Sequence, residues 1–174
     1  MKYCLLPTLC LLALLPVTAC SSTRSPGNER ETVQRDVEAC VRALYAGDLD
    51  TVLDLTHPRI LDQLGGRERV AATMGEALQP MRDSGMRVES FMFPRPPDFL
   101  QAGPRRYVVV PTLAVLVLGG QRVESLNFQV GVLEPGARGW LYVEGARLDA
   151  GNVHAVFADF PAGYTFPAIY RKKL

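Results

Sequence analysis

The chain has 174 residues, of which 19 are Lys or Arg and 18 are Asp or Glu, so its formal net charge at neutral pH is +1. A nearly neutral chain argues against binding of nucleic acid, which depends on clustered Lys and Arg. The length suits one ordinary domain, which can bury enough apolar surface to fold without disulfide bonds.

The N-terminus has the pattern of a targeting segment. An apolar run from Leu5 to Leu15 follows Lys2. It is shorter than the roughly 20 apolar residues of a membrane span and has the length of the hydrophobic region of a secretory signal. The residues Val17-Thr18-Ala19-Cys20 resemble the lipobox of bacterial lipoproteins, in which the signal is cut before an acylated cysteine. The alternative is an ordinary secretory signal with a chance cysteine.

The lipobox resemblance implies cleavage after Ala19, attachment of fatty acids such as palmitate to Cys20, and a location in the cell envelope. The membrane, reached through this N-terminal lipid, is then one partner. Ser21 follows the cysteine, whereas an aspartate there favours retention in the inner membrane of such lipoproteins. We therefore expect the outer membrane, facing the periplasm, in a cell with two membranes.

Composition divides the chain into four parts. They are a signal peptide (1–19), a lipidated tether rich in polar and helix-breaking residues (20–28), one domain (29–160) and a C-terminal tail (161–174). The basic residues near the end, at 171–173, are expected to be part of a solvated tail.

Helices are predicted first. Val33, Val37, Val41 and Leu44 recur at steps of three and four residues and so share one helical face. Cys40 lies on the same helix and is expected to be a small, buried hydrophobic residue.

Breaking residues then divide the helical half. Gly47 is expected to end the first helix and Asp48 to cap the next, while Pro58 suits the first turn of a third. A longer helix should follow Gly65-Gly66, with Pro80 kinking it or ending it early. Gly85 closes the helical half.

Strands are predicted after residue 85. At least four strands are expected, over residues 86–93, 105–118, 121–133 and 140–148, and they should be consecutive and antiparallel. Gly119-Gly120 has the form of a two-residue hairpin turn. Pro111 suggests a bulge or an edge position.

The third of these strands alternates in polarity. Leu126, Phe128, Val130 and Val132 should point one way, and Ser125, Asn127 and Gln129 the other. Such alternation predicts a sheet with one buried face. Helices followed by an antiparallel sheet place the chain in the α+β class.

Two stretches resemble the NTF2-like superfamily. Residues 42–53, Arg-Ala-Leu-Tyr-Ala-Gly-Asp-Leu-Asp-Thr-Val-Leu, are similar to its first helical corner, and residues 139–145, Gly-Trp-Leu-Tyr-Val-Glu-Gly, to its last long strand. The likeness extends over residues 31–149 and includes features of uncharacterised bacterial members. It implies an NTF2-like cone, in which N-terminal helices pack in a curved antiparallel sheet.

Cones of this kind serve isomerases, dehydratases, cyclases and non-catalytic binding modules, so residues must decide the function. When the chain is matched at residues 46–50, the oxyanion-donating tyrosine of the ketosteroid isomerases falls on Cys40 and their general-base aspartate on Leu64. A leucine cannot accept a proton, and a thiol is a poor oxyanion donor. Isomerase chemistry of that type is therefore not expected.

Other chemistry has little support. His57 and His154 are too few and too far apart to predict a metal site, and no cofactor motif is present in the sequence. Asp54 and His57 could meet on a helix, but Pro58 disfavours a helical backbone at residue 57. We expect this histidine to make a capping or solvent contact instead.

The cavity of such a cone is expected to be a binding site, with its walls formed by the apolar face of the first helix and by the side chains of Leu126, Phe128, Val130 and Val132. Four polar residues are candidates for its mouth: Tyr45, His57, Tyr107 and Tyr142. The ligand is expected to be a small apolar molecule or a protein, and the sheet could also form a homodimer. The alternatives are an enzyme with an unrecognised site and a structural subunit of an envelope complex.

Overall fold

The computed structural model describes residues 26–174. Ala19, Cys20, the predicted signal peptide and the first part of the tether lie outside these residues. The helices are α1 (Pro26–Ala46), α2 (Leu49–Leu55), α3 (Pro58–Gln63), α4 (Arg67–Asp83) and α5 (Val153–Val156), with a short 3₁₀ turn, η1 (Gly145–Arg147). The strands are β1 (Arg87–Met92), β2 (Asp98–Ala102), β3 (Arg105–Leu118), β4 (Gln121–Leu133), β5 (Leu141–Glu144) and β6 (Tyr170–Lys173).

The predicted start of the helical half is confirmed in its main features. Val33 and Val37 are fully buried on one face of α1. Gly47 follows α1 with a φ of 79°, a left-handed conformation that favours glycine. Asp48 caps α2 by accepting a hydrogen bond from the Thr51 backbone N–H at 3.2 Å. The first helix begins earlier than expected, so residues 26–28 are helical and not part of a tether.

The prediction that Pro80 ends α4 early is wrong, since the helix continues to Asp83. Pro80 is exposed and lies within the last turn of α4. A proline there removes one backbone hydrogen bond but does not displace packed side chains, so the helix can complete its turn. Gly85, with a φ of 77°, then separates α4 from β1, as expected.

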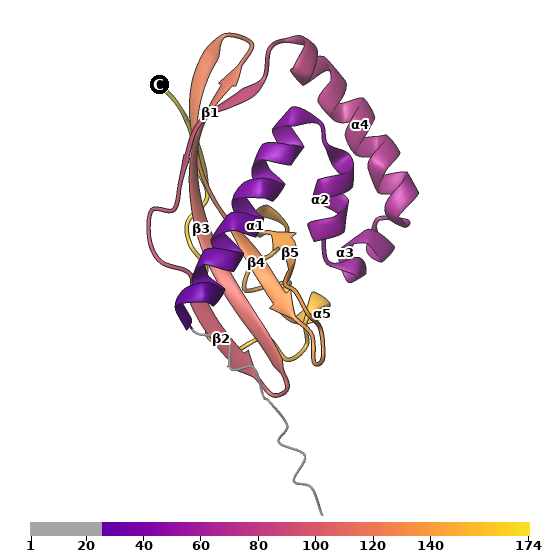
Figure 1. The fold of residues 1–174 in the computed structure, drawn as a ribbon, viewed down its shortest axis with the longest axis vertical. Helices are drawn as coiled ribbons and strands as arrows, with labels where there is room; N and C mark the ends of the chain where they lie inside the picture. The colour runs from indigo at the N-terminus through magenta and orange to yellow at the C-terminus, as the bar shows by residue number, and fades with distance from the viewer. Residues whose placement is uncertain (1–25) are drawn as a thin grey trace, which may run out of the picture.

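Within residues 26–174 the strands form one six-stranded antiparallel sheet, in which β1, β3, β4 and β5 are neighbours in that order (Figure 1). The structure is therefore α+β. β2 pairs with the first part of β3, and β6 with β4. The long β3–β4 hairpin turns at Gly119-Gly120, where both residues have positive φ, as the sequence predicts.

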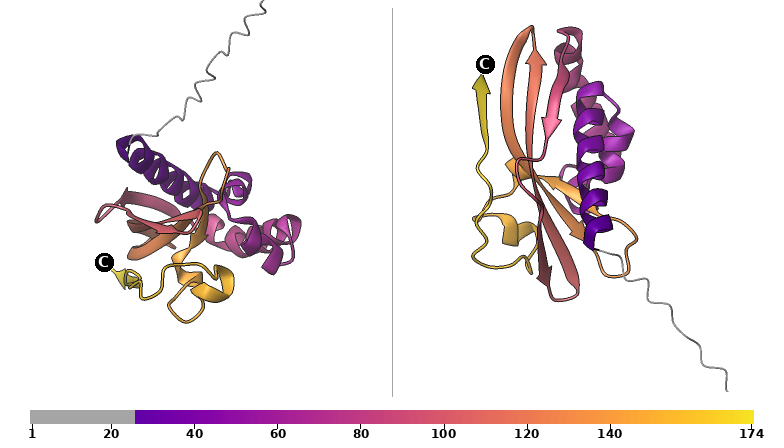
Figure 2. Two further views of the ribbon diagram at one scale, coloured as in Figure 1. Left: turned by 90° about the horizontal axis from the view of Figure 1, so that it is seen from below. Right: turned by 60° about the vertical axis from the view of Figure 1, so that its left-hand side comes forward.

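The prediction for the last part of the sheet needs two corrections. The strand expected over 140–148 is limited to β5, because η1 begins at Gly145. The expected C-terminal tail instead crosses the sheet and ends in β6, whose Arg171 pairs in register with Ser125 of β4. Figure 2 shows this segment on the side of the sheet opposite the helices.

Pro111 lies inside β3, which is a central strand. One edge of β3 pairs with β2 as far as Val109 and with β1 from Leu113 onward. Pro111 falls between these two ladders and faces a partner only on β4, where it pairs with Phe128. A proline fits here because this edge of β3 has no ladder to interrupt.

The prediction of one buried sheet face is wrong, because both faces are covered. Helix α1 covers one face, where Val108, Val110 and Trp140 are buried. The segment after β5 covers the other face, and Phe157 and Phe160 are buried there. Four consecutive residues of β3, 107–110, are fully buried because their side chains alternate between these two cores.

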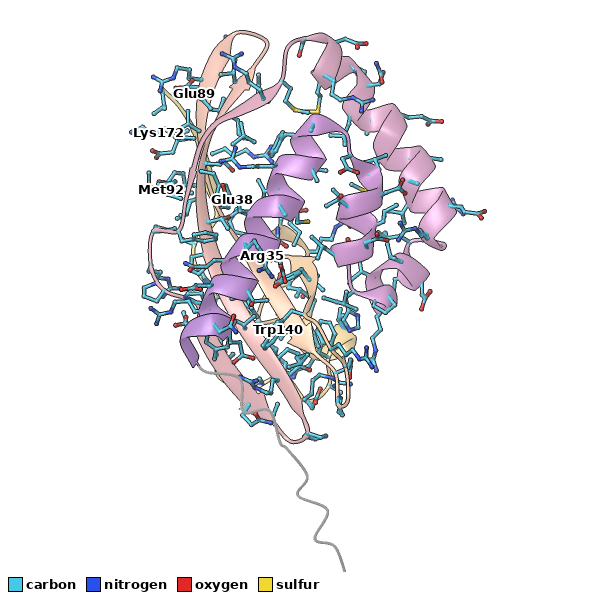
Figure 3. All side chains as sticks on the ribbon, viewed as in Figure 1. Arg35, Glu38, Glu89, Met92, Trp140 and Lys172 are labelled. Atoms are coloured by element: carbon cyan, nitrogen blue, oxygen red, sulfur yellow. The ribbon has the colours of Figure 1, made fainter. Side chains whose placement is uncertain are left out.

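The side-chain view illustrates this layering. Trp140 packs between α1 and the sheet, whereas Glu89 and Met92 lie on the edge strand β1 and Lys172 lies on β6, at the opposite edge (Figure 3). In the part of the chain that the structure describes, no helix combines the length and the apolar character needed to cross a membrane.

Candidate functional site

A cavity of about 410 Å³ lies between the helices and the sheet. Residues from α1, α2, α3 and α4 form one wall, and residues from β3, β4 and β5 form the other. Its volume falls within the range of small-molecule binding sites in proteins. The cavity is therefore the first place to look for a ligand.

The helical wall is mainly apolar, although Tyr45, Arg69 and Thr73 also line it. On α1, Val33 and Val37 pack against the sheet, while Val41 and Leu44, farther along the same helix, line the cavity. The other helices complete this wall with Val52, Ile60, Leu61, Leu64, Val70 and Met74. Only part of the apolar stripe of α1 is thus used for the core, and the rest is available to a ligand.

The part of the sheet wall formed by β4 is polar, contrary to the prediction, although Phe91, Leu116 and Val143 of other strands also line the cavity. Ser125, Asn127 and Gln129 of β4 line the cavity. Their register partners on the neighbouring strands are Ala114, Thr112 and Glu144, which line it as well because paired residues of antiparallel strands share a face.

The residues expected to form the strand wall lie on the other face of the sheet. Phe128, Val130 and Val132 belong to the core beneath the C-terminal segment, and Leu126 lies near Phe166 of that segment. The predicted alternation of polar and apolar side chains along β4 is confirmed. The apolar side chains, however, point away from the cavity, and the polar side chains point into it. The unbroken apolar run of β3 was the sequence signal that both faces are buried and that the polar side of β4 could therefore face inward.

Glu144 and Asn127 form the polar centre of the cavity. The Asn127 side-chain amide donates to Glu144 Oε1 at 3.2 Å, and its own Oδ1 accepts the Phe128 backbone N–H at 2.8 Å. Asn127 is thereby fixed with its amide group toward Glu144. Among the residues the structure describes, Glu144 has no ion-pair partner.

Two of the four predicted pocket residues, Tyr45 and Tyr142, do line the cavity. The Tyr142 hydroxyl donates to Asp36 Oδ2 at 3.4 Å, a long hydrogen bond. Burial, together with the nearby Asp36 carboxylate, raises the pKa of Tyr142 well above its usual value. Burial also raises the pKa of Tyr45. Both hydroxyls are therefore neutral near pH 7 and can donate hydrogen bonds.

Cys40 lines the same cavity and is half-buried. Burial, reinforced by the negative charge of Glu144, raises the pKa of its thiol to about 11. A thiol with this pKa is protonated at neutral pH, so it is a poor nucleophile. Cys40 was expected to be buried; it is half-buried, with its protonated thiol on the cavity surface.

His57 does not line the cavity. Its Nδ1 accepts the Arg59 backbone N–H at 3.3 Å and so caps α3, while its ring meets Phe157 edge-on with centroids 5.1 Å apart. Its Nε2 lies 3.4 Å from Glu134 Oε1, without the geometry of a hydrogen bond. The expected capping role is thus observed.

Asp54 turns away from this histidine. Its carboxylate is exposed and pairs with Arg67 at 2.8 Å, which joins α2 to α4. No Asp54–His57 pair is formed.

Tyr107 lies on the face of the sheet opposite the cavity. Its hydroxyl donates to Asp159 Oδ1 at 2.7 Å, and Arg105 bridges Asp159 and Glu134. These groups tie the C-terminal segment to β3 and to the turn after β4. Tyr107 therefore serves the packing of the back core, and the prediction that it lies near the cavity mouth is wrong.

Residues 26–174 contain no cluster of three or more His, Cys, Asp or Glu side chains that could hold a metal ion. The chain matches no protein-family model, no curated protein and no solved structure. The cavity is consequently the feature of the molecule that bears most directly on function.

Proposed function

We propose that this protein is a binding module whose cavity holds a small amphipathic molecule. The observation that carries the proposal is the contrast between the two walls of one cavity, mainly apolar on the helices and polar on β4. Polar side chains turned into a cavity give a ligand its orientation, and apolar side chains supply most of the contact area. The sequence led us to expect a small apolar ligand; the polar residues of β4 favour one that also carries a polar head.

We further propose that the domain is an NTF2-like cone. The order of helices and strands, the packing of α1 against the sheet and the cavity between them support this assignment. The two positions that the NTF2-like match aligns with the catalytic groups of the isomerases, Cys40 and Leu64, both line the cavity. They occupy the expected place but carry no isomerase chemistry.

Lipid anchoring of Cys20 remains part of the proposal. If it is correct, only residues 21–25 separate the anchor from α1, which gives a reach of about 17 Å for an extended chain. The domain would then be held close to the membrane surface, in the outer membrane of a cell with two membranes.

The anchor can be tested in the native host. Mass spectrometry of the purified protein should find an acylated N-terminal Cys20, and Cys20→Ala should leave an uncleaved or misplaced precursor. An unmodified N-terminus at another residue would contradict the proposal. Fractionation that places the protein wholly in the inner membrane would contradict the outer-membrane assignment alone.

Binding can be tested with the neutral fluorescent probe phenylnaphthylamine, whose emission rises in apolar surroundings. The folded protein should bind it, and Ala114→Phe, which places a ring inside the cavity, should abolish binding. Ala155→Phe adds the same ring at an exposed position on α5 and should leave binding unchanged. Equal binding by both variants, each shown to be folded by its thermal unfolding curve, would refute the proposed site.

One observation favours catalysis as a second candidate function. Glu144 places a carboxylate in the cavity beside Tyr45, Tyr142 and Asn127, and a carboxylate can act as a proton acceptor. If a substrate is turned over, Glu144→Gln should lower the rate by about a hundredfold or more, equivalent to about 2.7 kcal/mol of transition-state stabilisation. Unchanged turnover in this variant would exclude Glu144 as the proton acceptor.

A further inference from the structure

The charge distribution of the cavity points to the class of its ligand, given the proposed binding function. Glu144 is the one carboxylate among the described residues that line the cavity. Its Oε1 accepts a hydrogen bond from Asn127, and the described residues supply no partner to Oε2. A half-buried carboxylate without a cation favours a ligand that supplies one.

The surrounding polar wall also has unused hydrogen-bonding capacity. Thr112 is only 5 % exposed and lines the cavity, yet its hydroxyl forms no hydrogen bond with another described residue. The side chains of Ser125 and Gln129 likewise form none within residues 26–174. Ser125 and Gln129 are half-buried and Thr112 is buried, and all three line the cavity without a partner among the described residues, so their polar groups are available to a polar ligand head.

The local electrostatics agree with a cationic head. After burial, the charge of Glu144 is the second cause of the raised pKa of Cys40; at Tyr45 the positive charge of Arg171, an exposed residue of β6, lowers the pKa and outweighs the opposing effect of Glu144. Two arginines also line the cavity, Arg69 and Arg147, but both side chains are exposed. Negative charge therefore lies on the polar wall, and positive charge is in contact with solvent.

We propose that the cavity takes an amphipathic amine, with its ammonium group against the Glu144 carboxylate and its apolar body against α2, α3 and α4. The ammonium donates to Glu144 and can also donate to the hydroxyl oxygens of Thr112 or Ser125. The alkyl or aromatic body contacts Val52, Leu61, Val70 and Met74. An anionic amphiphile would either place its negative charge against the Glu144 carboxylate, where the two repel, or bind with its head group away from the polar residues of β4.

The test compares octylamine, octanol and octanoate, which share one alkyl chain and differ in the head group. Their affinities are measured by displacement of phenylnaphthylamine from the whole mature protein at neutral pH. We expect octylamine to bind at least about tenfold more tightly than octanol, since hydrogen bonds to charged groups contribute more than neutral ones. Glu144→Gln should reduce this preference to about twofold or less without weakening octanol.

Arg147→Gln is the matched control, because it removes a charge from the same cavity lining and should preserve the preference for the amine. Tighter binding of octanoate than octylamine, or an amine preference that survives in Glu144→Gln, would overturn the inference. Binding of all three compounds without preference would overturn it and leave the binding module intact. Failure of the probe and of every alkyl compound to bind would overturn both.

Discussion

Asn127 and Phe128 are consecutive residues of β4 whose side chains serve opposite faces of the sheet. Asn127 lines the cavity and donates to Glu144, while Phe128 is 1 % exposed and stacks on Phe166 of the C-terminal segment, with ring centroids 5.3 Å apart. A shift of one residue in the register of β4 would exchange the two environments. The position of the cavity therefore depends on the packing of both faces.

The core beneath α1 should depend on Trp140. This side chain is 2 % exposed, packs among the residues of α1 and β3, and has Arg106 over its ring at 5.6 Å. Trp140→Ala should lower the free energy of unfolding by about 3–5 kcal/mol, because both apolar burial and packing are lost. Denaturant unfolding measures this change, and a loss within about 0.5 kcal/mol would mean that the ring is not buried.

The back core should depend equally on the C-terminal segment. Phe157 is fully buried and contacts both His57 and Tyr107. Phe157→Ala should destabilise the protein by about 3–5 kcal/mol. Phe99, which is 37 % exposed, is the control, and its replacement by alanine should cost less. If Phe157→Ala were the milder change, the covering of the second sheet face would be wrong.

The fold could be predicted from the sequence only in part. Two features could be predicted because each depends on a local rule of backbone geometry: the helix that carries Val33 and Val37, and the hairpin turn at Gly119-Gly120. The face that β4 turns toward the helices could not be predicted, because an alternating pattern defines two faces and does not say which of them meets the helices. That choice is made by Phe157, Phe160 and Phe166, which lie far along the chain and cover the apolar face.

The candidate site was partly predictable for the same reason. Tyr45 and Tyr142 were identified as pocket residues and do line the cavity. Glu144 was missed because its role depends on pairing in register with Gln129, a contact made only when β5 joins β4. His57 was misplaced because its ring turns toward Phe157 and the back core.

His57 should make stability depend on pH. Burial lowers the pKa of this histidine, despite an opposing effect of Glu134. The unfolded chain, with a histidine pKa of about 6.5, therefore binds the proton more readily than the folded chain. The free energy of unfolding should fall as pH decreases from about 6.5 to the lower folded pKa, and this contribution should not change further below it.

The variant His57→Asn isolates this effect, because an asparagine side chain can still accept the Arg59 N–H and cap α3. Its free energy of unfolding should vary less with pH between about 7 and 5 than that of the unaltered protein. His154→Asn changes an exposed histidine and serves as the control. An identical pH profile for His57→Asn and the unaltered protein would refute the prediction.

Cys40 should react slowly with iodoacetamide. Its pKa of about 11 leaves little thiolate near pH 8, and the rate should rise about tenfold per pH unit until the pKa is approached. Glu144→Gln should speed the reaction at a given pH, since it removes a negative charge that raises this pKa. Mass spectrometry of the Cys40 peptide gives the rate, and reactivity like that of an unperturbed thiol, with a pKa of about 8.5, would contradict the assigned environment.

The most direct test of the binding cavity is a titration of the side-chain amide signals of asparagine and glutamine in NMR spectra. Asn127 and Gln129 line the cavity, whereas Asn152 and Gln79 are exposed on other parts of the protein. Addition of octylamine or phenylnaphthylamine should shift the Asn127 and Gln129 signals saturably and leave those of Asn152 and Gln79 unchanged. Saturable shifts confined to Asn152, Gln79 or other positions outside the cavity would contradict the account.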